Sequence, residues 1–401
     1  MEATGRASPR TLIDLVEGAA ARYADRPAMG LLREDGTAWH WSYRELERRS
    51  RIAAWRLRSL GLEPGSRLLT WSASSPGLAA TYIGAMRARL IYVPLDLQMT
   101  PPTIARIMDR CEPRHLVLGT GRGAPDPVAA GLGDFPTTTV DDLTADPDAS
   151  FPADWEVQQA AWTRPRPEDI FELVFTSGTT GAPKGVMLTH EGVCATIAGI
   201  HAVIPPMEHR LASLLPLSHL YEQAVGTFYP LDVGADILHI RTRSPRAMFE
   251  AIRGHRTTSM ILVPQLLDVF WSGLEREVEK SGRKASFDRL RAIARRLPFP
   301  LRRLLFRSLH RQLLGTDFRL FVSIGAFLPP SLQLAWENLG ITVLQGYGST
   351  ETAFGTANTE RDRGPGTVGR TVPPFELRIA PDGELLFRGP SLFKGYWRDP
   401  E

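Results

Sequence analysis

The sequence predicts an α/β protein with mostly parallel sheets. Strand-like apolar runs alternate with helix-like segments over residues 11–118, an alternation typical of parallel strands joined by helices. The apolar run 170–175 predicts another buried strand, and a loop rich in glycine and hydroxyl residues follows it. The 401 residues, 43% of them hydrophobic and 23% charged, are enough for several structural layers around a substantial core.

The early elements follow from hydrophobic periodicity and from residues that start or end helices. Residues 11–24 predict an amphipathic helix with one apolar face. Ser42 is expected to cap the next helix, 43–60, with Glu45 completing a capping box and Gly61 ending the helix. The remaining expected elements are strands at 39–43, 68–71, 91–93 and 115–118 and helices at 76–88 and from Pro101 onward.

One glycine motif is not expected to bind a dinucleotide. Residues 119–124 match G-x-G-x-x-[GA] after a strand, but Pro125 and Pro127 follow where a helix should open toward the pyrophosphate. Residues 121–168, rich in Pro, Asp, Ala and Thr, predict an irregular connection between two subdomains.

Cysteine content and charge exclude several classes of protein. Cys111 and Cys194 cannot build a disulfide framework, and no zinc-binding cysteine spacing occurs. Residues 1–10 lack the apolar core of a signal peptide, and no run of about 18 apolar residues occurs, so a cytoplasmic location is expected. The net charge of +3 hides a basic segment, 283–312, in an otherwise acidic chain, and no nucleic-acid partner is expected.

The loop from Phe175 to Gly185 carries the first functional signal. It holds three glycines, four hydroxyl side chains and Lys184 but no acid. Glycines let successive backbone N–H groups converge on an anion, and hydroxyl and ammonium groups suit phosphate. A flexible surface loop is the alternative, although the Pro-Lys-Gly ending is not expected of a linker. Pro183 stands where the common G-x-x-x-x-G-K-[ST] motif needs glycine.

Two later segments place polar or small residues after apolar strands. In 214–222, His219 follows a strand that ends at proline, and Glu222 lies three residues further on. The alternative for His219 is a satisfied histidine at a helix start, and the role of Glu222 stays open. In 321–329 a buried strand meets a Gly-Ala turn, for which a plain strand-to-helix turn is the alternative.

The segment 344–351 combines an aromatic ring with oxygen ligands. Tyr347 stands between two glycines, so its ring has room to lie flat on a base. Thr350 and Glu351 supply a hydroxyl and a carboxylate, which are hard oxygen ligands suited to Mg²⁺.

These motifs resemble those of the adenylate-forming superfamily, which includes acyl-CoA synthetases, luciferases and peptide-synthetase adenylation domains. Residues 175–185 fit its aromatic-T-S-G-[ST]-T-G-x-P-K-G pattern at every position, and residues 345–351 fit x-G-Y-G-x-T-E without exception. Residues 324–329 resemble its G-G-A-x-L-x-P loop, with Ile324 in place of the first glycine. The resemblance covers about residues 11–401.

The resemblance implies the N-terminal AMP-binding domain of such an enzyme. Two α/β subdomains with mostly parallel sheets are expected, 1–166 and 167–345, the second with the phosphate loop. A partial β-barrel subdomain is expected to start in 346–401. In the family a Thr-Gly-Asp motif and a small C-terminal domain come next, so the parent protein is expected to extend beyond this sequence.

The resemblance also implies the site residues. Lys184, Glu351, Thr176 and His219 are the expected catalytic residues, with Glu351 and Thr176 also placing Mg²⁺ and His219 near the substrate carboxylate. The expected ATP-binding residues are Thr176, Ser177, Gly178, Thr179, Thr180, Gly181 and Lys184 for the phosphates and Gly325, Ala326, Gln345, Gly346, Tyr347, Gly348 and Thr350 around the adenine and the reacting groups.

The implied activity is ATP-dependent conversion of a carboxylic acid to an acyl-adenylate, followed by thioester formation with CoA. The H-x-x-E element with Glu222 and the long segment 265–315 resemble long-chain fatty acid–CoA ligases, so a medium- or long-chain fatty acid is expected. The alternatives are acyl transfer to an acyl carrier protein and nucleotide binding without turnover. The oligomeric state stays open.

The basic segment suggests a membrane contact from its residues alone. In 298–312, leucines recur at helical spacing, and the arginines fall mainly away from them. Such a helix can lie on an anionic membrane surface, peripheral to the inner face of the membrane. The alternative is that the leucines pack into the core and the arginines form a solvated face. The leucines are 301, 304, 305 and 309, and the arginines are 302, 303, 307 and 311.

Overall fold

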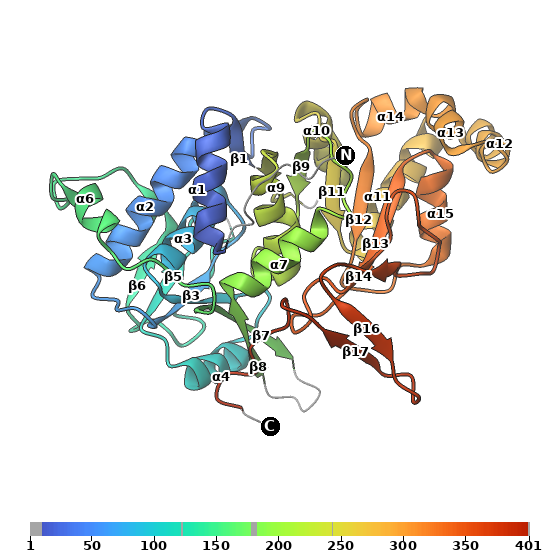
Figure 1. The fold of residues 1–401 in the computed structure, drawn as a ribbon. Helices are drawn as coiled ribbons and strands as arrows, with labels where there is room; N and C mark the ends of the chain where they lie inside the picture. Colours follow the sequence, from blue (N-terminus) through green and yellow to red (C-terminus); the bar gives the residue numbers. More distant parts are fainter. Residues whose placement is uncertain (1–9, 122, 178–182, 243, 400–401) are drawn as a thin grey trace.

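Two large sheets and their covering helices make up most of the molecule (Figure 1). The computed structural model describes residues 10–399 except 122, 178–182 and 243. In order along the chain, the helices are α1 (Leu12–Tyr23), α2 (Tyr43–Ser59), α3 (Pro76–Arg87), α4 (Pro101–Cys111), α5 (Val140–Thr144), α6 (Trp155–Ala160), α7 (His190–Ile200), α8 (Leu220–Gln223), the π-helix η1 (Ala224–Phe228), α9 (Tyr229–Asp232), α10 (Pro245–Gly254), α11 (Pro264–Lys280), α12 (Lys284–Ala294), α13 (Phe299–Leu305), α14 (Arg307–Leu313) and α15 (Pro330–Asn338).

The six-stranded sheet carries the phosphate loop. All its neighbours are parallel except the last two strands, which pair antiparallel on either side of that loop. In spatial order the strands are β6 (Thr137–Thr139), β5 (His115–Leu118), β3 (Arg67–Trp71), β4 (Ile91–Leu95), β7 (Ile170–Ser177) and β8 (Pro183–Thr189).

The nine-stranded sheet is parallel through its centre and antiparallel at both edges. A separate two-stranded hairpin, β16 (Glu376–Ile379) and β17 (Leu385–Arg388), lies beyond it. In spatial order the strands of the nine-stranded sheet are β15 (Arg370–Thr371), β14 (Thr356–Ala357), β13 (Thr342–Tyr347), β12 (Leu320–Ser323), β11 (Ser259–Leu262), β9 (Arg210–Ser213), β10 (Asp236–His239), β1 (Pro27–Leu32) and β2 (Ala38–Ser42).

The two sheets do not divide the chain at residue 166. The hairpin β1–β2, from the first segment, extends the nine-stranded sheet by pairing with β10. The hairpin β7–β8, which holds the phosphate loop, belongs to the six-stranded sheet through its contact with β4. Helix α1 packs against α2 and also against α7 and α9, so one buried core runs between the two sheets.

The helix ends explain most of the local agreement with the sequence. Helix α1 begins with a reciprocal capping box between Thr11 and Asp14. Ser42 caps α2 as expected, because its Oγ accepts from the backbone N–H of Glu45 at 3.2 Å. The expected second bond of the capping box, from the backbone N–H of Ser42 to the Glu45 carboxylate, is wrong, because that carboxylate accepts from Arg49 instead.

Two segments have a different secondary structure from the one predicted. Residues 121–168 were expected to be irregular, but β6 pairs parallel with β5 and two short helices, α5 and α6, follow it. The segment 298–312 is not one helix, because α13 ends and α14 begins at the buried Phe306. No helix within the described residues is long and apolar enough to span a bilayer.

Candidate active site

A cavity of about 470 Å³ opens where several parallel strands of the nine-stranded sheet end. Apart from Thr196 on α7, its lining comes from the residues that follow β9, β11, β12 and β13, at their carboxyl ends. Ligands of open parallel sheets bind at this edge, because the loops that leave the strands converge there. The position of the cavity therefore marks it as the leading candidate for the substrate site.

The cavity brings together residues from three of the predicted motifs. His219, Gly325, Gly348 and Thr350 all line it. Apolar side chains make up much of the remaining wall, which gives one pocket with a polar and an apolar part. The apolar lining includes Leu215, Leu220, Val225, Val263, Ile324 and Phe354.

The Gly-Ala turn presents bare backbone at the mouth of β12. Gly325 has a φ of +90°, a conformation that L-residues with side chains rarely adopt. Gly325 and Ala326 are both exposed, so a planar ligand can approach this turn closely. Ile324, the departure from the family pattern, is buried and lines the cavity.

In the x-G-Y-G-x-T-E segment, the ring of Tyr347 is exposed and the side-chain amide of Gln345 is buried. The Tyr347 side chain is 41% exposed, and its ring is stacked at 6.2 Å on Phe387 of the hairpin β16–β17. Gln345 is buried at the end of β13, and its Oε1 has no hydrogen-bond partner within the described part of the chain. Gly348 is required sterically, because a Cβ there would lie 1.7 Å from the carbonyl oxygen of Ala353.

The phosphate loop is held between β7 and β8. Thr176 on β7 pairs in register with Lys184 on β8, which sets the two ends of the loop side by side. Ser177 ends β7. The expected phosphate ligands Gly178, Thr179, Thr180 and Gly181 lie outside the described residues.

Tyr396 in the tail connects Lys184 with Glu351. The Lys184 ammonium lies 4.8 Å from the centre of the Tyr396 ring, and the Tyr396 hydroxyl donates to Glu351 Oε1 at 3.1 Å. Lys184 Nζ is also 3.8 Å from Asp399 Oδ2. No local pattern in the sequence indicates a role for Tyr396 or Asp399.

The tail reaches this position by pairing with β8. The N–H of Lys394 donates to the carbonyl oxygen of Met187, and the N–H of Trp397 donates to that of Gly185 at 2.7 Å. These bonds place the last described residues beside β8 rather than beside the hairpin β16–β17 (Figure 1).

His219 pairs with an acid that the sequence analysis missed. His219 Nε2 lies 3.4 Å from Asp96 Oδ2, and the imidazole is 60% exposed at the start of α8. The hydrogen bond from His219 is the largest effect that holds the pKa of Asp96 below its usual range. Asp96 lies just after β4 in the other sheet, so this pair spans the gap between the two sheets.

Glu222 is buried, and one of its two carboxyl oxygens has no hydrogen-bond partner among the described residues. Ser213 Oγ donates to Glu222 Oε1 at 2.6 Å, whereas Oε2 has no partner within the described residues. Burial raises the pKa of Glu222 to about 8. Glu222 therefore carries a proton at neutral pH, and it lines the cavity as a neutral polar group.

A family model described as AMP-binding enzyme matches residues 16–397. The long-chain-fatty-acid–CoA ligase FadD15 of Mycobacterium tuberculosis is 33% identical over 259 residues, which are 59% of this chain and 42% of that protein. The long-chain-fatty-acid–CoA ligase of Escherichia coli O157:H7 is 26% identical over 443 residues, covering 98% of this chain and 72% of that protein. This chain thus spans less than half the length of the mycobacterial relative.

Solved structures agree on the fold. VinN in complex with L-aspartate superposes with a TM-score of 0.73 at 23% identity, covering 98% of this chain and 91% of that one. The inhibitor-bound N-terminal domain of FACL13 from Mycobacterium tuberculosis gives 0.74 at 20% identity, covering 97% and 92%. The likeness confirms the predicted α/β class with mostly parallel sheets.

Proposed function

The chain belongs to the family of AMP-binding enzymes, as the sequence resemblance predicts, and from that premise we propose that its parent protein activates a long-chain fatty acid with ATP. The acid becomes an acyl-adenylate with release of pyrophosphate, and a thiol then takes the acyl group. CoA is the proposed acceptor, because AMP-binding acyl-CoA ligases use ATP and CoA. Transfer to an acyl carrier protein is the second candidate.

One observation supports a fatty acid above other acids. The cavity combines exposed polar groups around His219 and Thr350 with a largely apolar remainder. A carboxylate fits the polar part, where reaction with ATP would take place, and an alkyl chain fits the apolar part. Among the residues that the structure describes, no charged side chain lines the apolar part, since Glu222 is neutral there at pH 7.

We propose that this chain's own residues act by positioning and charge neutralisation. The carboxylate and the triphosphate are both anions, so the barrier falls when cationic and N–H groups hold them in line. Lys184 would bind the outer phosphates, Tyr347 would stack on adenine, and His219 would orient the carboxylate. Thr176 and Glu351 offer a hydroxyl and a carboxylate that suit Mg²⁺, which would neutralise the departing pyrophosphate.

The metal assignment has its own test. Glu351→Gln removes the charge of the proposed ligand but can still accept the hydrogen bond from Tyr396. Mg²⁺-dependent pyrophosphate release by the parent protein should fall at least about a hundredfold, in line with other lost electrostatic stabilisers, with unchanged circular dichroism. Undiminished turnover would show that Glu351 is not a metal ligand.

The substrate proposal is tested by pyrophosphate release with acids from acetate to palmitate. Val263→Phe adds volume to the wall of the cavity, and Val269→Phe adds the same volume at a 38% exposed position of α11. The first variant should lower kcat/KM for palmitate more than for short acids, and the second should change neither. A parent protein that releases pyrophosphate only with amino acids would overturn the fatty-acid assignment.

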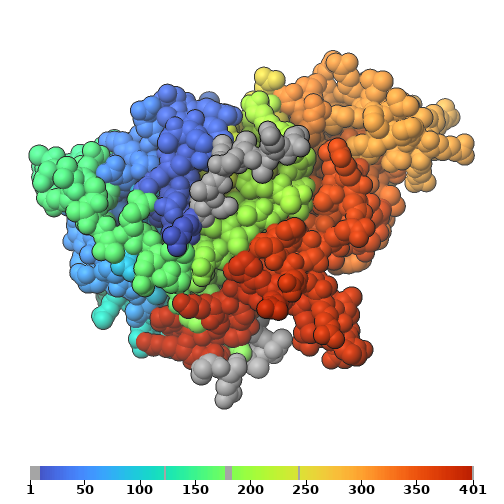
Figure 2. All heavy atoms as spheres, viewed as in Figure 1, coloured from blue at the N-terminus to red at the C-terminus, as the bar shows by residue number. Residues whose placement is uncertain are grey.

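We also propose that residues 298–312 contact an anionic membrane surface. Leu301 and Leu304 on α13 are 48% and 63% exposed, and Arg307 and Arg311 on α14 are exposed beside them in sequence. Figure 2 shows this part of the chain as the orange lobe that projects at the upper right. A sparingly soluble acid partitions into membrane, so an enzyme that uses it gains from docking there.

A further inference from the structure

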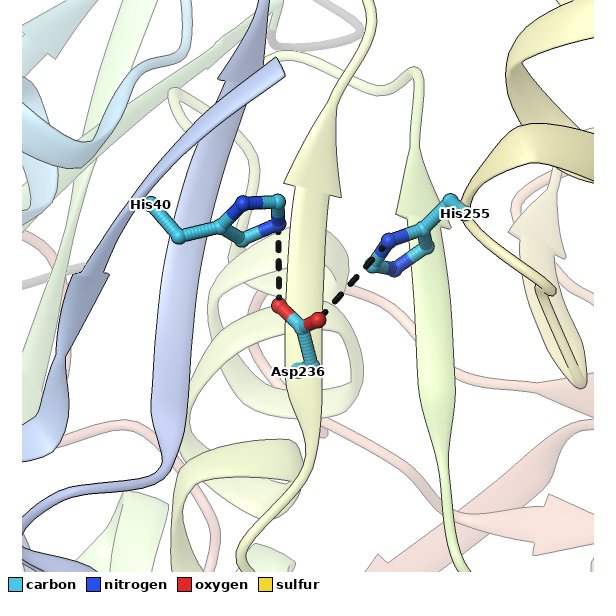
Figure 3. Close-up of side chains that lie close together, drawn as sticks. All are labelled: His40, Asp236 and His255. Atoms are coloured by element: carbon cyan, nitrogen blue, oxygen red, sulfur yellow. Dashed lines mark ion pairs between the residues drawn. The ribbon is translucent and has the colours of Figure 1, made fainter.

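Two histidines and an aspartate from three separate segments meet at the edge of the nine-stranded sheet away from the cavity (Figure 3). His40 lies on β2, Asp236 begins β10, and His255 follows the last turn of α10. The cavity lies at the carboxyl ends of the parallel strands, whereas Asp236 lies at an amino end. This group therefore does not belong to the proposed active site.

The distances suit one shared ion. His40 Nε2 is 3.3 Å from Asp236 Oδ1, and His255 Nδ1 is 3.7 Å from Asp236 Oδ2. One donor atom from each residue lies within 4.8 Å of the other two. Ligands at about 2.0–2.2 Å from a tetrahedral zinc ion lie roughly 3.4 Å apart, so a small rotation of the exposed His40 completes the set.

Gly30 makes this meeting possible. His40 pairs with Gly30 across the β1–β2 hairpin, and its ring lies over that residue on the way to β10. A Cβ on Gly30 would come within 2.4 Å of the His40 ring and within 2.6 Å of the Trp39 carbonyl oxygen. The backbone of Gly30 does not have a positive φ, so the missing side chain, not backbone freedom, is what the ring requires.

The cluster contains buried polar atoms without hydrogen bonds. The His255 side chain is 5% exposed, and its Nε2, which is the other ring nitrogen from the one near Asp236, has no hydrogen-bond partner among the described residues. Asp236 Oδ1 has no hydrogen bond there either and makes only the 3.3 Å ion-pair contact with His40. Buried polar atoms of this kind call for a water or an ion.

We propose that His40, Asp236 and His255 bind one transition-metal dication, with zinc as the best fit. Two imidazole nitrogens and a carboxylate form a donor set that zinc binds, with water as the fourth ligand, whereas Mg²⁺ and Ca²⁺ prefer oxygen alone. Arg210 is the nearby cation, and its guanidinium is already paired with Glu208 and Asp317. The ion would tie the β1–β2 hairpin to β10 and α10.

The test uses tag-free protein, freed of metal with a chelator and titrated with zinc without ATP. Calorimetry should show one zinc ion per chain, and cobalt at the same site should give a visible spectrum that zinc abolishes. His40→Gln should lower the affinity for zinc at least about tenfold and reduce the rise in Tm that zinc causes in the unmodified chain. The control is His201→Gln, because His201 pairs with Asp232 at 2.9 Å but belongs to no group of three potential metal ligands among the described residues; it should leave zinc binding unchanged.

A second variant tests whether the His40 ring needs the space that Gly30 leaves, and it retains all three proposed ligands. Gly30→Ala should lower the affinity for zinc as His40→Gln does, because its methyl group displaces the His40 ring. Absence of zinc binding in the unmodified chain, or equal affinity in the unmodified chain and His40→Gln, would overturn the proposal. Full affinity in Gly30→Ala would count against it as well, since the ring geometry depends on Gly30.

Discussion

Lys184 connects the end of the phosphate loop with the tail. Its ammonium contacts Tyr396 and Asp399, and its side chain is 29% exposed. If Lys184 binds the outer phosphates, Lys184→Ala should lower the affinity for ATP roughly ten- to a hundredfold but leave the affinity for AMP nearly unchanged. The reason is that a hydrogen bond to a charged group contributes about 1.5–3 kcal/mol. Calorimetry with both nucleotides measures the ratio. Lys394→Ala, which removes a lysine bonded to the Glu168 carbonyl, is the control. Equal losses for ATP and AMP would place Lys184 elsewhere in the site.

Tyr347 has a free ring face in a suitable place. Its stacking on Phe387 occupies one side, and 41% of the side chain is exposed. If adenine stacks on this ring, Tyr347→Ala should cost on the order of 1–3 kcal/mol of nucleotide affinity, and Tyr347→Phe should cost much less. Titration with AMP distinguishes the two. Equal losses for both variants would mean that the hydroxyl, not the ring, makes the contact.

Individual site residues could be predicted where a short motif fixes their neighbours. Gly325 and Thr350 line the same cavity although they are 25 positions apart, because both follow parallel strands of one sheet. Asp96 and Tyr396 could not be predicted. Each reaches its partner, His219 or Glu351, through a contact between distant segments, and no local pattern records such a contact.

At the scale of elements, the arginines and leucines of α13 do not have the exposure that the helical spacing predicts. Arg302 and Arg303 were expected to point away from the leucines into solvent. Arg302 donates to the Leu297 carbonyl, and Arg303 donates to the Phe318 carbonyl, so both are used inside the molecule. Leu301 and Leu304 are exposed instead. Periodicity alone could not predict this, because the free carbonyl groups come from other segments.

The membrane proposal therefore depends on α14 arginines and α13 leucines. Arg307→Gln with Arg311→Gln should lower binding to anionic vesicles, since each basic residue near the surface contributes about 1 kcal/mol of screened attraction. Leu301→Ser with Leu304→Ser should lower it further. Vesicle co-sedimentation at low and high salt measures both, and high salt should weaken the binding of the unmodified chain.

The matched control removes the same charge elsewhere. Arg361→Gln with Arg378→Gln changes two other exposed arginines and should leave vesicle binding unchanged. If the variants at 307 and 311 fold and sediment as well as the unmodified chain does, residues 298–312 are not a membrane contact.

Sheet membership was the least predictable property of the elements. The helices and strands expected before residue 118 are present within a few residues of their expected ends. Yet the hairpins β1–β2 and β7–β8 each join the sheet on the other side of residue 166. Strand pairing of this kind is set by contacts across the whole chain, whereas periodicity reports only which face of a segment is buried.

For the whole molecule, buried carboxyl groups make stability depend on pH. Glu172 is fully buried between Tyr82 and Gln223, which both donate hydrogen bonds to it. Burial raises its pKa from 4.5 to about 8, as it does for Glu222. Below pH 4.5 both the folded and unfolded chains carry these protons. Between about pH 4.5 and 8 only the unfolded chain loses them, so stability falls as pH rises, and above pH 8 the effect levels off.

Replacing these carboxyls with neutral amides should remove that part of the pH dependence. Glu172→Gln with Glu222→Gln should match the unmodified chain near pH 4.5 and be more stable at pH 7.5, by up to about 4 kcal/mol per carboxyl, because about three pH units separate the two conditions and each corresponds to about 1.4 kcal/mol. Urea unfolding from pH 4.5 to 8.5 gives the free energy at each pH. Glu376→Gln, at an exposed position of β16, is the control and should leave the profile unchanged. An unaltered slope in the double variant would mean that Glu172 and Glu222 are ionised in the folded chain, and that the cavity beside His219 holds a negative charge rather than a neutral wall.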